Sequence, residues 1–174
     1  VTNNGVAGSV ILNNKIYSGL SGKSGAFGHI VLDPNGKECF CGGRGCWSAY
    51  CSLYNLIGNE EDKLQTFFEK LDAKDPESMK RWDEYLTHFA QAVGNIFLSY
   101  DADVIIGGEL AHYLEPRLQE LKDKVKDYPV LAEETQKICI DMDSMNPMAE
   151  GAALTFVSQF LNNELEGFRL EDIQ

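Results

Sequence analysis

The sequence has no long hydrophobic run and no cluster of basic residues, and both absences narrow what the chain can do. Its apolar stretches are far shorter than the roughly 20 residues that cross a bilayer, so we expect no membrane association. The chain carries 15 Lys and Arg against 27 Asp and Glu, for a net charge of −12. Without a basic stripe these residues lack the electrostatic footprint of a nucleic-acid binder. Contact with DNA is therefore expected only through a module outside this sequence.

The sequence also lacks a leader, an internal repeat and a low-complexity linker. It begins at Val1, without a methionine and without a charged-then-apolar segment of the kind that directs secretion. We therefore expect part of a longer protein, in which residues 1–174 form one domain. Of the five cysteines, three fall in one motif, which leaves Cys51 and Cys139 as free thiols. Free thiols favour a reducing, cytoplasmic setting.

The most informative stretch is a glycine-rich loop that holds one histidine and three cysteines. His29 is followed by Cys39, Cys41 and Cys46 in GHIVLDPNGKECFCGGRGC. Zn²⁺ favours thiolate and imidazole ligands, and glycines permit the tight turns of a knuckle around one tetrahedral ion. The pattern predicts a structural zinc site held by these four side chains, in a knuckle of about residues 28–50. Such a closed site leaves no position for a reacting water.

Two other interpretations of the cysteines stay open. They are unpaired thiols of a cytoplasmic protein, or two of them form a disulfide. Cys39 and Cys41 are poor disulfide partners, because the bridge has a specific geometry that so short a loop strains.

Alternating hydrophobicity and turn residues predict an antiparallel meander at the start of the chain. Its strands are expected at 6–12, 15–18 and 29–32, with Asn13-Asn14 forming a tight turn between the first two. Short helices are then expected at 49–57 and 61–71.

A long central helix is the clearest single element. Asp75 and Pro76 are an N-cap and a first-turn proline, and apolar residues recur behind them at three- and four-residue spacing. These residues are Met79, Trp82, Leu86, Phe89, Val93, Ile96, Phe97 and Tyr100. The spacing predicts one buried face, with Trp82 in the core. His88 and His112 lie on helices without partners in sequence, and we expect both to be ordinary surface or core histidines.

The second half of the chain is predicted to begin with a strand, a glycine turn and a helix, in that order. A strand at 103–106 ends at Gly107-Gly108, and helix 109–124 follows. Such a turn lets backbone amides approach a phosphate, and tight packing explains it equally well. A further strand is expected at 137–142. A second cap, Asn146-Pro147, opens a helix to about Leu161, and an acidic tail occupies 164–174.

Taken together, these residues resemble the ROK family of bacterial repressors and sugar kinases. The resemblance rests on the knuckle with Gly28-His29 before it and residues 47–50 after it, on residues 5–19, on the strand 104–108 and on Gly151-Ala152-Ala153. It implies an α/β, actin-like ATPase or ribonuclease-H-like fold, of which this chain looks like the C-terminal half. In the family's regulators this half also contributes to dimer contacts, so a homo-oligomer is expected.

In sugar-kinase members of the family, the segment before the zinc histidine reads Gly-Glu-x-Gly-His and the knuckle continues Gly-Cys-x-Glu. Both glutamates hydrogen-bond sugar hydroxyls there, and the corresponding positions here are Ala26 and Ser48. Each charge-assisted hydrogen bond contributes about 1.5–3 kcal/mol, so losing two predicts much weaker hexose binding. The resemblance leaves His29 as the sugar contact, with one ring nitrogen on zinc and the other toward the sugar.

The family's phosphate-binding loop, near Gly-Thr-Gly-x-Gly-x-Gly, is eroded. Residues 2–9 keep Gly5 but carry Ala7 and Ser9 where glycines are usual. A Cβ at such positions impedes the approach of backbone amides to phosphate, which argues against ATP binding. Gly5, Gly107 and Gly108 are then a remnant of the nucleotide site. The kinases' catalytic aspartate belongs to the half that is absent here.

Three hypotheses of function follow. The first is the effector-binding and oligomerisation domain of a ROK-type transcriptional regulator, with structural zinc and a sugar or sugar derivative as effector. The second is half of an ATP-dependent sugar kinase in which other residues recover the hydroxyl contacts. The third is a structural domain that binds no small molecule. The joint loss of carboxylates at 26 and 48 and of loop glycines favours the first.

Overall fold

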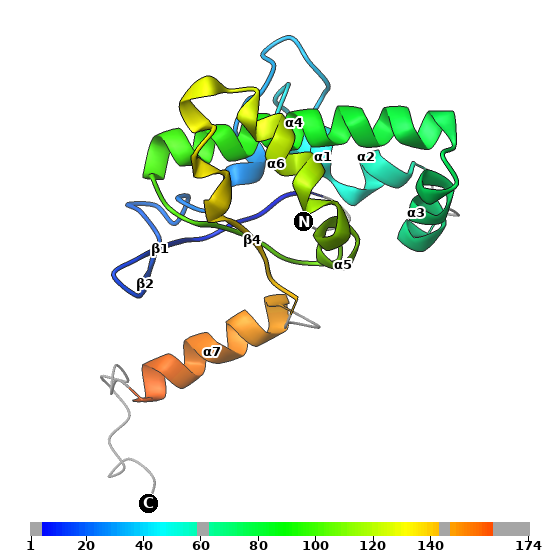
Figure 1. Ribbon diagram of the computed structural model, residues 1–174. Helices are drawn as coiled ribbons and strands as arrows, with labels where there is room; N and C mark the ends of the chain where they lie inside the picture. Colours follow the sequence, from blue (N-terminus) through cyan, green and yellow to red (C-terminus); the bar gives the residue numbers. More distant parts are fainter. Residues whose placement is uncertain (1–4, 59–62, 143–146, 162–174) are drawn as a thin grey trace, which may run out of the picture.

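The computed structural model describes residues 5–58, 63–142 and 147–161, and shorter elements surround one long helix, α4 (Pro76–Tyr100) (Figure 1). The Asp75 carboxylate accepts the Ser78 N–H at 2.8 Å, which confirms the predicted N-cap. α4 packs against α1 (Ser48–Cys51), α3 (Leu64–Asp72) and α6 (Leu118–Lys126).

The buried face of α4 matches the predicted apolar stripe in its middle turns. Trp82, Leu86 and Phe89 are at most 4% exposed, so the core assignment of Trp82 is confirmed. Its ring packs against Phe68 and Tyr85, and its Nε1 donates to Glu120. The prediction is wrong at the two ends of the stripe, because Met79 and Tyr100 lie in the terminal turns, where they are 49% and 39% exposed.

The N-terminal segment contains a hairpin in place of the expected three-stranded meander. β1 (Val10–Leu12) and β2 (Lys15–Tyr17) pair antiparallel, and Asn13 and Asn14 adopt φ of 51° and 61°, as the turn requires. The predicted third strand at 29–32 is wrong. Residues Phe27–His29 form a 3-10 helix, η1, and of the residues expected in that strand only Val31 makes a bridge, to Cys46. The chain turns there because Gly28 packs directly on the Val6 carbonyl, which a Cβ would approach to 2.0 Å.

Two predicted helices are interrupted. The segment 49–57 is α1 and α2 (Leu53–Ile57), separated by Ser52 in extended conformation, whose hydroxyl caps α2 at the Asn55 N–H. The segment 109–124 is α5 (Ala111–Leu114), the 3-10 turn η2 (Glu115–Arg117) and α6. Pro116 explains this break, since it has no N–H for a continuous helix. Glu61, the expected start of α3, lies outside the described residues.

A second, parallel pair of strands completes the α/β pattern. β3 (Val104–Ile106) pairs with β4 (Ile138–Ile140), and the connection runs through α5, η2, α6, η3 (Pro129–Leu131) and η4 (Glu134–Lys137). α7 (Pro147–Leu161) leads away from this body (Figure 1). The Asn146 cap and the tail 164–174 lie outside the described residues. Within the part that is described, no helix is long and apolar enough to cross a membrane.

Candidate metal centre

Short backbone hydrogen bonds fold the cysteine loop back on itself. Cys39 N–H donates to Gly43 at 2.9 Å, and Gly45 N–H donates to Lys37 at 2.8 Å. The Gly45 carbonyl accepts the Leu32 N–H at 2.7 Å. Gly45 has φ of +71°, and a Cβ there would lie 1.5 Å from the Asp33 carbonyl oxygen. The loop therefore closes by contact between two backbone segments, which only glycine permits at this position.

This loop brings together the four side chains that the sequence singles out. The ligand atoms of His29, Cys39, Cys41 and Cys46 all lie within 4.8 Å of one another. Cys39 Sγ is 3.9 Å from His29 Nδ1, and Cys41 Sγ is 3.7 Å from Cys46 Sγ. Tetrahedral Zn–S bonds of about 2.3 Å place two sulfurs about 3.8 Å apart, so the donor set and its spacing fit such an ion. All five cysteines are free, which leaves no support for the disulfide interpretation.

Two of the four side chains in the cluster are buried and two are exposed. Cys39 and Cys46 are 6% and 3% exposed, whereas His29 and Cys41 face solvent. Burial raises the pKa of the Cys46 thiol to about 12, while the Gly43 N–H lowers the pKa of Cys41. A cation held by these ligands would stabilise both thiolates, because its charge would outweigh these local effects. The Phe40 ring covers His29 edge-on, with 5.3 Å between ring centroids.

The two positions expected to correspond to the family's sugar-binding glutamates, Ser48 and Ala26, differ in their surroundings. Ser48 is 2% exposed, and its Oγ accepts the Val6 N–H at 2.9 Å. Ser48 also lies beside Gly28, where a Cβ would come within 2.3 Å of its Oγ. Ala26 is exposed and carries no polar side-chain atom. Neither side chain is placed to accept hydrogen bonds from a polyhydroxyl ligand.

The glycines assigned to the nucleotide site lie against different segments. Gly5 is buried beside Ser48, and Gly8 N–H donates to the Gly25 carbonyl at 3.1 Å. Gly107 lies beside Asp141, the residue after β4, and Gly108 adopts φ of +90° before α5. The strand and the glycine turn are as predicted, whereas the helix after them is broken into α5, η2 and α6. α5 is only four residues long, however, so it adds little dipole to attract a phosphate. Residues 2–4 of the eroded loop lie outside the described residues.

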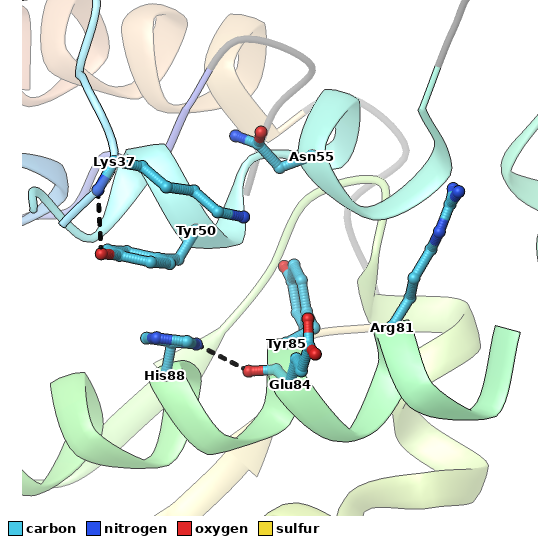
Figure 2. Close-up of a pocket in the computed structure, with 7 residues that line it drawn as sticks. All are labelled: Lys37, Tyr50, Asn55, Arg81, Glu84, Tyr85 and His88. Atoms are coloured by element: carbon cyan, nitrogen blue, oxygen red, sulfur yellow. Dashed lines mark hydrogen bonds between the residues drawn. The ribbon is translucent and has the colours of Figure 1, made fainter. Parts of the chain in front are cut away.

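Sequence reasoning missed one further feature, a polar cleft between the knuckle and the first half of α4 (Figure 2). It includes His88, which stacks on Tyr50 with 4.0 Å between ring centroids. The available signal was the spacing of Arg81, Glu84 and His88, which places the three on one face of a helix.

The chain resembles known proteins over most of its length. The model of the ROK family matches residues 2–155. Over 71 residues, 41% of this chain and 17% of the relative, it is 45% identical to the xylose repressor of Bacillus subtilis. Over 145 residues, 71% of this chain and 46% of the relative, it is 29% identical to the glucokinase of Thermotoga maritima.

A solved structure gives the same picture of the fold. A ROK family protein of Streptococcus pneumoniae, determined in complex with sucrose, superposes with a TM-score of 0.76 over 92% of this chain and 57% of that one. At 19% identity this likeness shows a shared actin-like ATPase fold. The chain spans about half the length of the glucokinase and of the streptococcal protein.

Proposed function

The chain belongs to the ROK family, and from that membership we propose that it is the C-terminal, effector-binding and oligomerisation half of a ROK transcriptional regulator. The chain is similar both to a repressor of the family, the xylose repressor, and to a sugar kinase, the glucokinase. The difference between a regulator and a kinase therefore has to come from the residues of the sugar pocket.

The burial and hydrogen bonding of Ser48 are the observation on which this proposal rests. A kinase-type pocket needs a carboxylate at this position to accept sugar hydroxyls, and here a buried hydroxyl is bonded to the Val6 N–H. At the second carboxylate position, Ala26 has no acceptor. Each missing charge-assisted bond costs about 1.5–3 kcal/mol, so the pair lowers affinity for a hexose by roughly two to four orders of magnitude. The effector is then a sugar or sugar derivative held by other contacts, with His29 among them.

Zinc has a structural role in this proposal. His29, Cys39, Cys41 and Cys46 would hold it, and four protein ligands would tie η1 to the segment that enters α1. The ion supplies folding free energy when bound and no chemistry. The free thiols fit a reducing cytoplasm, and DNA contact falls to a module outside this chain. Like the regulators that it resembles, the protein would act as a homo-oligomer.

Half of a sugar kinase is the alternative, and the alignment with the Thermotoga maritima glucokinase over 71% of the chain favours it. In that case the catalytic base comes from the other half of the protein. Other polar groups would also have to replace the two carboxylates.

A phosphorylation assay separates the two. The full-length protein that contains this chain is incubated with ATP, Mg²⁺ and glucose, fructose or N-acetylmannosamine, and ADP release is followed by a coupled assay. We expect no sugar-dependent turnover. Thermal unfolding and metal analysis of the same sample establish that the protein is folded. Sugar-dependent turnover would overturn the regulator proposal in favour of the kinase.

A further inference from the structure

The three thiols of the knuckle differ in how easily a dissolved molecule reaches them. Cys41 is exposed, whereas Cys39 and Cys46 are 6% and 3% exposed. An oxidant in solution therefore meets the Cys41 sulfur first. Oxidation of a cysteine depends on access to its sulfur and on its thiolate character, and a cysteine that ligates a metal ion is a thiolate. As an exposed member of the candidate metal centre, Cys41 meets both conditions.

A partner for an oxidised Cys41 is already beside it. Cys46 Sγ lies 3.7 Å from Cys41 Sγ, and a disulfide needs about 2.0 Å. Cys46 is held in place, because it forms a bridge with Val31 and the next N–H, that of Trp47, donates to the Ile30 carbonyl at 2.8 Å. The exposed Cys41 side chain is therefore the one that moves to close the gap.

A glycine leaves room next to this pair of sulfurs. A Cβ at Gly43 would lie 3.5 Å from Cys41 Sγ and 3.9 Å from Cys46 Sγ, both at ordinary contact distance. The space that a side chain would fill there is open to a small molecule, and hydroperoxides are small enough to use it.

The other cysteines are less suited to form a bridge. Cys39 is separated from Cys41 by one residue, a spacing that strains a disulfide, and its Sγ lies 3.9 Å from His29 Nδ1. Cys51 is fully buried, and its thiol donates to the Tyr85 carbonyl at 3.5 Å. Cys139 is exposed but does not belong to the cluster.

We propose that Cys41 is an oxidation site for hydroperoxides, and that a Cys41–Cys46 disulfide then displaces the metal. The Cys41 sulfur attacks one peroxide oxygen, the O–O bond breaks, and a sulfenic acid forms as water or an alcohol leaves. The Cys46 sulfur attacks the Cys41 sulfur, the S–O bond breaks, and the oxygen leaves as water. Two thiolates are oxidised, one hydroperoxide is reduced, and two protons from solvent balance the departing Zn²⁺.

The consequence of the bridge rests on the structural zinc of the proposed function. Only His29 and Cys39 would remain as ligands, too few for a tetrahedral site. The tie between η1 and the segment that enters α1 would be lost next to Trp47, which packs edge-on against Phe89 of α4 with 5.1 Å between ring centroids. The effector-binding half would thereby respond to hydroperoxide as well as to its effector.

Peptide mapping with a measurement of metal release tests the proposal. The full-length protein that contains this chain is reduced, loaded with zinc and treated with hydrogen peroxide, and a colorimetric chelator follows the released zinc. Trypsin cleaves after Arg44, between the two cysteines, so the bridge joins peptide 38–44 to peptide 45–63 in a non-reducing digest. Fragmentation of the linked peptides identifies the cysteine in each. We expect Cys41 and Cys46, zinc release in step with the bridge, and reversal by a thiol reductant in the presence of zinc.

Two variants and two controls examine the role of access. Cys41→Ser should abolish the bridge, but it also removes a ligand. Gly43→Ala keeps all four ligands and places a methyl group beside both sulfurs, so it should keep the metal and slow bridge formation at least about threefold. Gly42→Ala is the matched control, because nothing lies within 4 Å of a Cβ built there, and its rate should stay within about twofold of the wild type. Cys139→Ala should leave the rate unchanged.

Four results would overturn the proposal. They are a bridge that uses Cys39 or Cys139, a bridge that persists in Cys41→Ser, oxidation only after a chelator has removed the metal, and equal rates for Gly42→Ala and Gly43→Ala. Protein isolated without zinc would instead reject the zinc assignment of the proposed function, and the peptide map would still decide whether Cys41 and Cys46 form the bridge.

Discussion

Substitution of Gly45 gives the most direct test of how the knuckle closes. A Cβ at this position would lie 1.5 Å from the Asp33 carbonyl oxygen, and φ is +71°. The left-handed conformation alone costs an alanine about 1–2 kcal/mol. Relief of the overlap also moves the backbone away from Leu32 and Lys37, which loses two hydrogen bonds of about 0.5–1.5 kcal/mol each. The Gly45→Ala variant should therefore lose about 2–5 kcal/mol of unfolding free energy.

Gly42 provides the matched control, because it shares the conformation without the overlap. Its φ is +86°, and nothing lies within 4 Å of a Cβ built there. Gly42→Ala should pay only the conformational cost of about 1–2 kcal/mol. For a chain of this size each kcal/mol lowers Tm by about 2–4 °C, so we expect losses of about 10 °C for Gly45→Ala and about 4 °C for Gly42→Ala.

The assay is thermal unfolding by circular dichroism, with metal content measured on the same samples. Gly45 precedes Cys46, so Gly45→Ala should also reduce metal occupancy, whereas Gly42→Ala should keep it. Equal losses of Tm in the two variants would refute the claim that backbone contact at Gly45 closes the loop.

Three further predictions concern the metal, the core and pH. Elemental analysis should find one zinc per chain, and a chelator should lower Tm. The Cys46→Ala variant should lose the metal, whereas Cys139→Ala, at an exposed cysteine outside the cluster, should keep it. Retention of the metal by Cys46→Ala would reject the assignment of the zinc ligands. Leu86→Ala should cost about 2–5 kcal/mol in urea unfolding. Leu98→Ala, at 66% exposure, should stay within about 0.5 kcal/mol, and equal costs would contradict the core assignment. Hydrogen bonds from the Ser78 N–H and hydroxyl lower the pKa of Asp75. The Asp75 carboxylate therefore stabilises the fold at pH values above its unfolded-state pKa, and this contribution is lost as the pH falls through its folded-state pKa. The difference in unfolding free energy between the wild type and Asp75→Asn, measured at pH 7, 5 and 3, should become smaller as the pH falls.

The sequence is sufficient where a local rule decides the structure. Asp75 and Pro76 specify the start of α4, and the Asn13-Asn14 pair specifies its hairpin turn. The cysteine spacing predicts the four-residue cluster, because ligands and turn glycines are close together in the chain.

Prediction fails where distant segments decide. The expected third strand at 29–32 does not form: His29 ends η1 and Val31 makes only an isolated bridge, beside Gly28, which packs on the Val6 carbonyl, a contact that no local pattern records. The hydrophobic periodicity does not predict the helix break at Ser52, because a serine is tolerated inside a helix and can also cap one. The polar cleft is not predicted either, because Lys37 and Arg81 line it from segments that only the tertiary fold brings together.

The burial of Ser48 limits what can be placed at this position. Its hydroxyl joins the N-terminal segment to α1 through Val6 N–H, close to Gly5 and Gly28. A Ser48→Glu substitution would remove that hydroxyl acceptor and demand room for a carboxylate at a position that is 2% exposed. The Ser48→Glu variant is therefore expected to loosen the junction between the N-terminal segment and α1, so restoring an acid there needs compensating changes around Val6 and Gly28.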